Sequence, residues 1–302
     1  MIVTGSFAKA LYPGVKKWHG EAFKEWPVEY TQFFEKETTK RAYEEYVQFT
    51  GLGLAAKKRE GQGITYDDMT QGWVSRFVPV VYALGFVITK EMVADDLYGI
   101  IGKKRAKYLA FSMRQTKEIV AANVYNRAFN SSYAGPDGQP LISTANVNYT
   151  GGTYSNQLST NTDLSEAALE SLTIQIANAT NDRGLRISLM ADKLCIPHNL
   201  EYEAERILGS SYRVGTSDND LNALRSLGKF PGGVAKSHYF TDTDAWFVRT
   251  NCKEDGMMYF EREGISFDMD NEFDTNNAKY KSEERYTFGF GEKRCIYGSQ
   301  GS

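Results

Sequence analysis

The feature that most constrains this chain is a long amphipathic stretch over residues 103–130. Apolar or small side chains recur there at steps of three or four residues, which places them on one face of a helix. They are Leu109, Met113, Thr116, Val120, Val124 and Ala128. Because Gly99 and Gly102 each weaken a helix interior by about 1 kcal/mol relative to Ala, we expect the helix to begin near Lys103. At roughly 42 Å, it exceeds the usual length in globular proteins and would act as a strut.

The same helix concentrates positive charge. It carries seven basic side chains and a single acidic one, Glu118. The basic residues are Lys103, Lys104, Arg105, Lys107, Arg114, Lys117 and Arg127. The whole chain holds 35 basic and 38 acidic residues, a net charge of -3, which is not the basic excess of a dedicated nucleic-acid-binding domain. The balancing carboxylates must therefore lie elsewhere in the subunit or on a neighbouring one.

Length and composition predict a folded protein of one large or two medium domains. With 302 residues, of which 41% are hydrophobic, the chain can bury a sizeable core. Cys195, Cys252 and Cys295 lie far apart, which indicates neither a disulfide framework nor a metal clip and fits a reducing cytoplasm. The start lacks the features of a signal peptide, and the most apolar window, residues 77–88, is too short to cross a bilayer. We therefore expect an intracellular protein without membrane contact.

The segments before the long helix predict an arm and a hairpin. Residues 11–50 mix large aromatic side chains with charges, and Pro13 and Pro27 are expected to interrupt any long helix. Residues 51–89 begin with glycines and a run of three basic residues and continue with β-branched and aromatic ones. This pattern predicts two strands joined through a mobile, glycine-rich tip.

The segments after the long helix alternate between loops, helices and strands. Residues 131–163 are rich in Gly, Ser, Thr and Asn and predict a loop or long hairpin. Asp163 or Ser165 can cap a second helix. Beyond it the pattern predicts a strand, a short helix, a polar loop over residues 211–233, paired strands up to residue 250 and final strands over residues 257–299.

No motif of catalysis or metal binding is present in the sequence. The carboxylates of Asp268, Asp270, Glu272 and Asp274 alternate, but the glycine and final glutamate of a calcium-binding EF-hand are missing, so we place them on one strand face. His19, His198 and His238 are scattered without metal-binding spacing, and Cys195 is expected to be a buried, inert thiol. We therefore predict no catalytic residue, no cofactor and no metal site, and a protein that is not an enzyme.

The arm, the hairpin and the long helix lack an obvious partner within the chain. Extended segments are uncommon in compact domains unless they are functional, and exposed apolar patches usually mark interfaces. The interpretation we favour is that further copies of the chain supply the missing surfaces and build an assembly. The alternative is that the hairpin and the helix pack on one another in a monomer.

The order of these segments resembles the major capsid proteins of tailed bacteriophages with the Hong Kong 97-like shell fold, and most closely the Mu-like major head subunits. The resemblance runs from about residue 11 to the C-terminus and is most specific in AFSMRQTKEIVAANVYNRAFN and DGQPLISTAN. It implies an α+β fold with an N-terminal arm over residues 1–50, an E-loop hairpin over 51–89, a peripheral domain with the spine helix over 90–164, an axial domain over 165–274, and a C-terminal strand over 275–302 that returns to the peripheral domain. Residues 212–233 would surround the local symmetry axis of the capsomer.

Candidate contacts between subunits are basic residues on the hairpin and the long helix. They are Lys57, Lys58, Arg59, Arg76, Arg114, Lys117 and Arg127. Some relatives join neighbouring subunits by an isopeptide bond between an E-loop Lys and an Asn; Lys57 and Lys58 lie in a suitable region, although lysines at a hairpin tip are usually solvated or ion-paired. The chain has Asn146 where a His often follows STA in the family, so no role tied to that histidine is carried over.

The resemblance implies a structural subunit that self-assembles into hexamers and pentamers of an icosahedral or prolate virion head enclosing double-stranded DNA. The implied partners are further copies of the chain, a scaffold protein, a portal, a decoration protein and the packaged DNA, contacted without sequence specificity. Assembly would take place in the host cytoplasm. Two alternatives stay open, an encapsulin-like nanocompartment shell with enzyme cargo and a hydrolase with a dispersed site.

Overall fold

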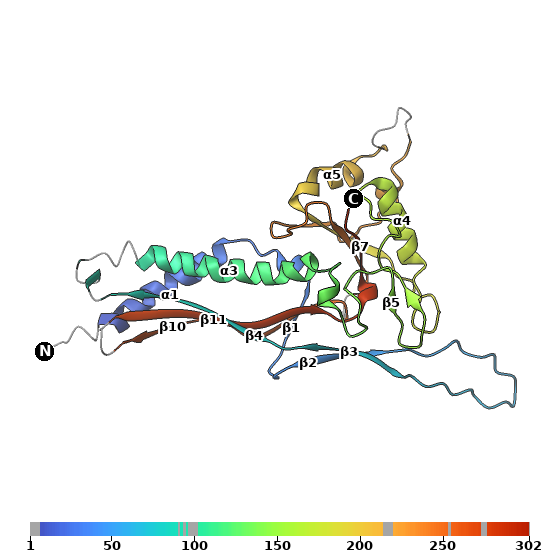
Figure 1. Ribbon diagram of the computed structural model, residues 1–302, viewed down its shortest axis with the longest axis horizontal. Coiled ribbons are helices and arrows are strands. Elements are labelled where there is room, and N and C mark those ends of the chain that lie inside the picture. The colour runs from blue at the N-terminus through green and yellow to red at the C-terminus, as the bar shows by residue number, and fades with distance from the viewer. Residues whose placement is uncertain are drawn as a thin grey trace.

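A computed structural model describes residues 7–89, 91–92, 95, 102–213, 220–252, 255–272 and 277–301. Its long axis follows an extended sheet with two helices lying on it, and a second sheet with shorter helices stands at one end (Figure 1). A hairpin projects past the second sheet (Figure 1). The predicted features at Gly99, at Asp274 and over residues 214–219 lie outside the described residues. The predicted mixture of helices and sheets is confirmed.

The long sheet has the strand order β1-β10-β11-β4. Its strands are β1 (Glu35–Thr38), β4 (Val80–Ile88), β10 (Met257–Asn271) and β11 (Ala278–Phe290). β10 and β11 form a long antiparallel hairpin, β4 pairs antiparallel with β11, and β1 runs parallel to β10. Along most of β11 buried side chains alternate with more exposed ones, because one face of an antiparallel sheet can be covered while the other meets solvent.

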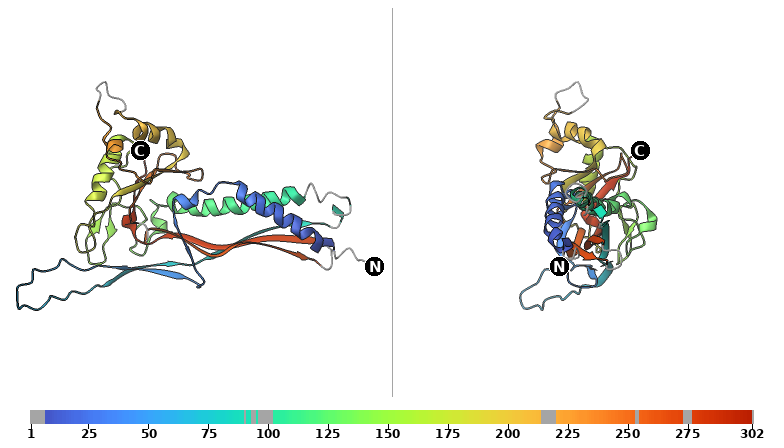
Figure 2. Two further views of the ribbon diagram at one scale, coloured as in Figure 1. Left: turned by 180° about the vertical axis from the view of Figure 1, so that it is seen from behind. Right: turned by 90° about the vertical axis from the view of Figure 1, so that its left-hand side faces the viewer.

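Two helices, α1 (Phe7–Glu25) and α3 (Lys103–Asn126), cover one face of the long sheet (Figure 2). Leu109 and Met113 of α3 pack with Val15 of α1 and with Ile88 and Tyr280 of the sheet. The predicted long helix is confirmed, although it ends at Asn126, four residues before the predicted end at residue 130.

The expected break at Pro13 is wrong, since α1 runs through this residue. Proline has a helical φ, but inside a helix it removes one backbone donor and its ring clashes with the carbonyl oxygen four residues earlier, at a cost of about 3 kcal/mol or more. Val15 and Ala22 of α1 are buried, and Val15 packs against α3 and the long sheet. This burial offsets the cost of the proline. Pro27 does lie just after the helix ends, as expected.

The second sheet has the strand order β12-β9-β7-β8. Its strands are β7 (Ala191–Pro197), β8 (Val234–Ser237), β9 (Trp246–Thr250) and β12 (Ile296–Ser299), and its helices are α4 (Glu166–Ala177), η5 (His198–Leu200), α5 (Glu201–Gly209) and α6 (Ala223–Ser226). Leu169, Leu172, Ile176 and Trp246 lie in its core. Ser165 caps α4 by accepting a hydrogen bond from the N–H of Ala168. β8 and β9, predicted as a pair, lie on opposite sides of β7.

The chain ends in the second sheet, which corrects the prediction of one strand returning to the long sheet. β11 does belong to the long sheet, but β12 pairs with β9. A turn at Gly291 and the short helix η6 (Lys293–Cys295) separate the two strands. A Cβ at Gly291 would lie 2.6 Å from the backbone oxygen of Asp255, so this turn needs a glycine.

The projecting hairpin consists of β2 (Glu44–Phe49), β3 (Gln71–Phe77) and the connecting residues 50–70. The predicted boundaries, 51–89, are therefore wrong, since the first strand precedes Gly51 and β4 belongs to the long sheet. Pro79 cannot donate to a strand ladder, and it lies between β3 and β4. The remaining elements are η2 (Tyr30–Gln32), η4 (Ser131–Tyr133), β5 (Asn146–Val147) and β6 (Thr153–Tyr154). No helix among the described residues is long and apolar enough to span a membrane.

Candidate assembly surfaces and the junction between the two sheets

Lys117, a predicted contact between subunits, is buried between α3 and the long sheet. Its Nζ lies 2.8 Å from Oε2 of Glu284 and 3.8 Å from Oε2 of Glu261. The rings of Tyr30, Tyr259 and Tyr286 approach the ammonium group, with centroids at 5.4, 5.2 and 4.9 Å. Because Glu284 is buried as well, the ion pair is closed within the subunit. Contrary to the prediction, Lys117 is not available to a neighbouring subunit.

Arg114 is also buried, against α1. Its Nη2 donates to the backbone oxygen of Phe23 at 3.0 Å, and its guanidinium lies 4.0 Å from the centroid of the Phe23 ring. Such a cation over an aromatic face is attracted to it. The structure thus corrects the prediction for Arg114 too, because α1 occupies the surface that the sequence left open for a neighbouring subunit.

Glu118, the single acid of the long helix, holds the segment that follows α1. Its carboxylate accepts the backbone N–H of Glu29 at 3.0 Å and of Tyr30 at 2.9 Å. Burial raises the pKa of Glu118, and the two N–H groups partly offset this shift. The charges in the middle of the helix therefore bind the arm to the long sheet inside one subunit.

The other predicted contact residues lie on the surface. Lys57, Lys58 and Arg59 are exposed in the connection between β2 and β3. Arg76 is exposed and pairs with Glu45 of the same hairpin, Nε to Oε1 at 3.0 Å. Arg127 is exposed and lies over the ring of Tyr133, 4.3 Å from its centroid. Contacts of these residues with a neighbouring subunit stay a prediction.

The connection over residues 50–70 holds apolar side chains in solvent. Leu54 is 83% exposed and Tyr66 is 87% exposed. Exposed apolar residues also include Leu52, Ile64 and Met69. Exposed apolar patches usually mark sites where a partner binds. We call residues 50–70 the extended loop and treat it as a candidate assembly surface.

The base of the extended loop is fixed to the body of the subunit. Oδ2 of Asp67 accepts the N–H of Gly53 at 2.7 Å, and Arg183 forms an ion pair with Asp67. Arg183 also donates to the backbone oxygen of Asp68. The N–H of Gly53, together with Arg183, lowers the pKa of Asp67. The loop is thus held where it leaves the hairpin while its apolar side chains stay uncovered.

A second uncovered apolar surface runs along β4, which is an edge strand of the long sheet. Val80, Val81, Leu84 and Val87 are exposed along it. A groove of about 250 Å³ lies where the start of β4 meets the end of α3. Among its lining residues are Val80, Tyr82, Val124, Arg127, Tyr133 and Phe288. This surface combines apolar side chains with one exposed arginine.

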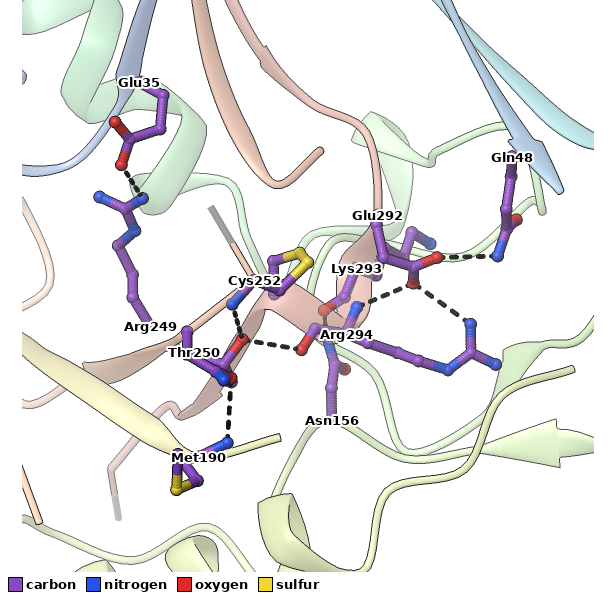
Figure 3. The surroundings of a disulfide bond; sticks show 12 residues. Glu35, Gln48, Asn156, Met190, Arg249, Thr250, Cys252, Glu292, Lys293 and Arg294 are labelled. Atoms are coloured by element: carbon purple, nitrogen blue, oxygen red, sulfur yellow. Dashed lines mark hydrogen bonds and ion pairs between the residues drawn. A yellow bond between two sulfur atoms is a disulfide. The ribbon is translucent and has the colours of Figure 1, made fainter. Parts of the chain in front are cut away.

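Where the two sheets meet, charged side chains form a buried network (Figure 3). Arg294 of η6 lies 2.8 Å from Asp182, Nη2 to Oδ1, and 3.2 Å from Glu292, Nη1 to Oε1. Its Nε donates to the backbone oxygen of Thr180 at 2.9 Å. Glu292 in turn accepts from Nε2 of Gln48 in the hairpin at 2.8 Å (Figure 3). Arg294 thus links the turn near residue 182 to the start of β12. Glu292 links Arg294 in turn to Gln48 of the hairpin.

Lys293 and Asn156 complete this junction. Nζ of Lys293 lies 2.5 Å from Oδ1 of Asp137 and donates to the backbone oxygen of Gln139 at 2.8 Å. Burial lowers the pKa of Lys293, and Asp137 opposes that shift. Asn156 donates to three backbone oxygens and accepts from Ser143 and from Asn146. Asn146 therefore has a structural role in this chain.

A disulfide bond joins Cys252, which follows β9, to Cys295 of η6 (Figure 3). The prediction of no disulfide is wrong, because the fold brings together two cysteines that lie 43 residues apart, with Cα atoms 5.1 Å apart. A Cβ at Gly256 would lie 2.6 Å from the Cβ of Cys295, so a glycine is needed beside the bond. Cys195 is buried and free, as predicted, and burial raises the pKa of its thiol to about 12.

Sequence reasoning missed the junction because its members come from four distant segments, Gln48 of the hairpin and residues 137–156, 180–182 and 292–295. No motif relates these segments. One usable signal was the adjacent pair Lys293 and Arg294 inside the predicted final strand, since basic residues within an apolar stretch need buried acceptors.

Solved structures with similar folds come from bacteriophages and from a virus-like particle. The Mycobacterium phage Adephagia structure has 11% identity, covers 92% of this chain and 91% of its own, and has a TM-score of 0.54. The procapsid protein of bacteriophage JBD30 has 13% identity, covers 98% and 76%, and has a TM-score of 0.52. The virus-like particle from Pyrococcus furiosus has 10% identity, covers 95% and 98%, and has a TM-score of 0.53. At these identities the likeness concerns the fold, and the predicted Hong Kong 97-like α+β fold is confirmed.

No curated protein matches the sequence. A sequence model of the family described as phage capsid protein matches residues 74–299, which is most of the chain. The protein therefore belongs to the phage capsid protein family and is a structural subunit of a capsid.

Proposed function

We propose that copies of this capsid subunit form hexamers and pentamers and close into an icosahedral or prolate head around double-stranded DNA, without catalysing a reaction. Family membership and the likeness to capsid and procapsid folds support this proposal. The observation that carries it is the extended loop. It projects from the body (Figure 1), and its apolar side chains are exposed. The closer likeness to Mu-like major head subunits stays a prediction.

The surface that receives the extended loop is, in this proposal, the apolar stretch along β4 of a second copy. Both surfaces are apolar and uncovered, and within one subunit they lie on different elements (Figure 1). Contact between copies would remove Leu54 and Tyr66 on one subunit and Val81 and Leu84 on the next from water. Each fully buried side chain of this size contributes roughly 1.5–3 kcal/mol, so a few such contacts repeated around a ring stabilise a shell.

Besides Arg127, the exposed start of α3 offers basic residues to partners. Lys103, Lys104 and Lys107 are exposed there, while Arg114 and Lys117 are not. We assign this end to weak contact with packaged DNA or with acidic residues of a neighbouring subunit. Binding to DNA would fall steeply with salt concentration. A scaffold protein, a portal and a decoration protein complete the proposed partners, and assembly would take place in the host cytoplasm.

The proposal is tested by assembly of the chain with Leu54→Ser and Tyr66→Ser. Because these side chains are exposed in the subunit, the variants should fold normally yet fail to form particles, as seen by sedimentation velocity and negative-stain microscopy. The matched control is Ile174→Ser on α4, an exposed apolar residue outside both surfaces, which should assemble as the wild type does. Wild-type particle yields from both loop variants would contradict the proposal.

A second candidate function is a nanocompartment shell that encloses protein cargo. The observation behind it is that this chain covers 98% of the chain of a virus-like particle from Pyrococcus furiosus in a similar fold, so the fold also builds a particle that is not described as a phage head. The two functions differ in content. Particles purified from their natural source should contain double-stranded DNA in the first case and a defined protein cargo in the second, which ultraviolet absorbance and protein gels distinguish.

A further inference from the structure

Two histidines that lie 40 positions apart in the sequence meet at one edge of the second sheet. β7 ends at Pro197 and β8 ends at Ser237, and these two residues are paired in a parallel ladder. His198 and His238 follow directly, so both leave the sheet at the same edge. The centroids of their rings are 3.8 Å apart.

Each imidazole has a carboxylate partner. Nδ1 of His198 lies 3.0 Å from Oε2 of Glu201, and Oε1 of Glu201 accepts from Nζ of Lys236 at 2.5 Å. Nδ1 of His238 is hydrogen-bonded to Oε1 of Glu29, and Oε2 of Glu29 accepts the backbone N–H of His238 at 3.0 Å. Glu29 belongs to the segment after α1, so the cluster joins the arm to the second sheet.

Glu29 is held in this position by its own backbone. Its N–H donates to Oε1 of Glu118 at 3.0 Å, and its side chain is only 12% exposed. One possible ligand atom from each of Glu29, His198 and His238 lies within 4.8 Å of the others. The carboxylate is thus fixed on one side of the cluster, while the ring of His238 remains open to solvent.

We propose that Glu29, His198 and His238 bind a divalent transition-metal ion of the zinc class, with a water molecule in the fourth position. Two imidazole nitrogens and one carboxylate oxygen are a ligand set that zinc favours, whereas calcium and magnesium prefer oxygen alone. Zinc bonds of about 2.0–2.2 Å in tetrahedral geometry place ligand atoms roughly 3.3 Å apart. The three ligand atoms lie within 4.8 Å of one another, so binding would require small side-chain rotations, for which the exposed His238 has the most room.

Glu201 is a positioning residue for this site. A carboxylate that accepts the proton of one ring nitrogen fixes the tautomer and leaves the other nitrogen free for the metal. Glu201 holds Nδ1 of His198 in this way, and Lys236 holds Glu201. At His238 the metal takes the place of the proton shared with Glu29, and the ring carries its proton on Nε2 instead. The ion would clamp the segment after α1 to the edge of the second sheet.

The test is zinc binding by the full chain after removal of metal with a chelator. Isothermal titration with zinc chloride should show about one ion per chain, and cobalt(II) should give the visible absorption bands of a four-coordinate site. His198→Ala and His238→Ala should each weaken zinc binding by at least about 100-fold. Glu201→Gln should weaken it about 10- to 100-fold, as expected for an orienting partner. Glu29→Gln should lower it by more than Glu201→Gln does.

The control is Glu203→Gln, which removes a partly exposed carboxylate from the same helix, α5. It should bind zinc as the wild type does. Because His238 is 64% exposed, its replacement leaves the fold intact, which metal-free thermal unfolding verifies. Absence of zinc binding by the wild type overturns the proposal, as does undiminished binding by the His198→Ala and His238→Ala variants. The result does not depend on whether the chain assembles.

Discussion

The extended loop and the helix-covered face of the long sheet place their side chains in opposite environments. In the loop, leucine and tyrosine side chains lie in water beside solvated basic residues. Under α3, Lys117 and Glu284 lie buried among tyrosine rings. The difference teaches that a basic residue in this sequence is not by itself a sign of a surface for partners, because a buried charge such as Lys117 finds its partners inside its own subunit. In the proposed function the uncovered apolar side chains of the loop form the assembly surface.

The two regions should also differ in what they contribute to folding. Removing one partner of a buried ion pair leaves an uncompensated charge, whereas an exposed side chain already interacts with water in the folded state. Substitutions under α3 should therefore change the free energy of unfolding, and substitutions in the loop should change assembly. The four predictions that follow run from the largest expected effect on unfolding to the smallest.

Lys117→Met should give the largest loss of stability. It leaves the carboxylate of Glu284 buried without its cation, which costs about 3–5 kcal/mol. Denaturant unfolding of the unassembled chain measures this loss. Lys107→Met, which breaks the exposed pair with Glu25, is the matched control and should cost less than about 1 kcal/mol. Adding Glu284→Gln to Lys117→Met should restore part of the stability. Equal losses of unfolding free energy for Lys117→Met and Lys107→Met would contradict the prediction that the buried ion pair contributes more to stability than the exposed one.

Breaking the disulfide at the junction should have the next largest effect. The bond closes a segment of 43 residues, and Cys252→Ser with Cys295→Ser should lower the free energy of unfolding by about 2–4 kcal/mol. Thiol titration of the oxidised chain in denaturant should give one thiol per chain, from Cys195, and three after reduction. Three thiols before reduction would show that the bond is absent.

His19 should make the long-sheet half sensitive to acid. Burial lowers the pKa of His19 from 6.5 to about 4, so the folded state keeps it neutral while the unfolded chain takes up a proton below about pH 6.5. Stability is therefore lost as the pH falls from about 6.5 to about 4, by about 3 kcal/mol. The measurement is the difference in unfolding free energy between the wild type and His19→Leu at several pH values. A difference that does not change with pH contradicts this prediction.

Substitutions in the extended loop should have the smallest effect on stability. Leu54→Ser and Tyr66→Ser should each change the free energy of unfolding by less than about 0.5 kcal/mol, because both side chains are more than four-fifths exposed and lose little burial. Denaturant unfolding of the unassembled chain checks this. A loss above about 2 kcal/mol would mean that the loop folds back onto its own subunit, as in the monomer alternative.

The sequence predicted the long helix, the second helix with Asp163 or Ser165 as its cap and the final long strands, because these elements follow local rules of periodicity and capping. It failed at Pro13, at the start of the hairpin and at β12. In each case contacts with distant residues decided the outcome. A helix tolerates one proline when its face is buried, and a strand joins the sheet that offers it a free edge.

The candidate assembly surfaces, too, could be predicted from the sequence only in part. The sequence identified the hairpin as a projecting segment and found its basic tip, since glycines and charges there are a local signal. It could not separate the buried Arg114 and Lys117 from the exposed Lys103 and Lys107, because all four belong to one helix. Whether each side chain is buried or exposed depends on whether α1 and the long sheet cover its side of the helix.

By itself the sequence determined the helical strut, the absence of a local catalytic motif and the resemblance to capsid subunits. Only the tertiary structure decided that Cys252 meets Cys295, that Arg294 meets Asp182, and that His198 meets His238 beside Glu29. The physical reason is the sequence separation over which each interaction acts. Periodicity and capping act within a few residues, whereas these pairs form where strand register and sheet order bring distant segments together.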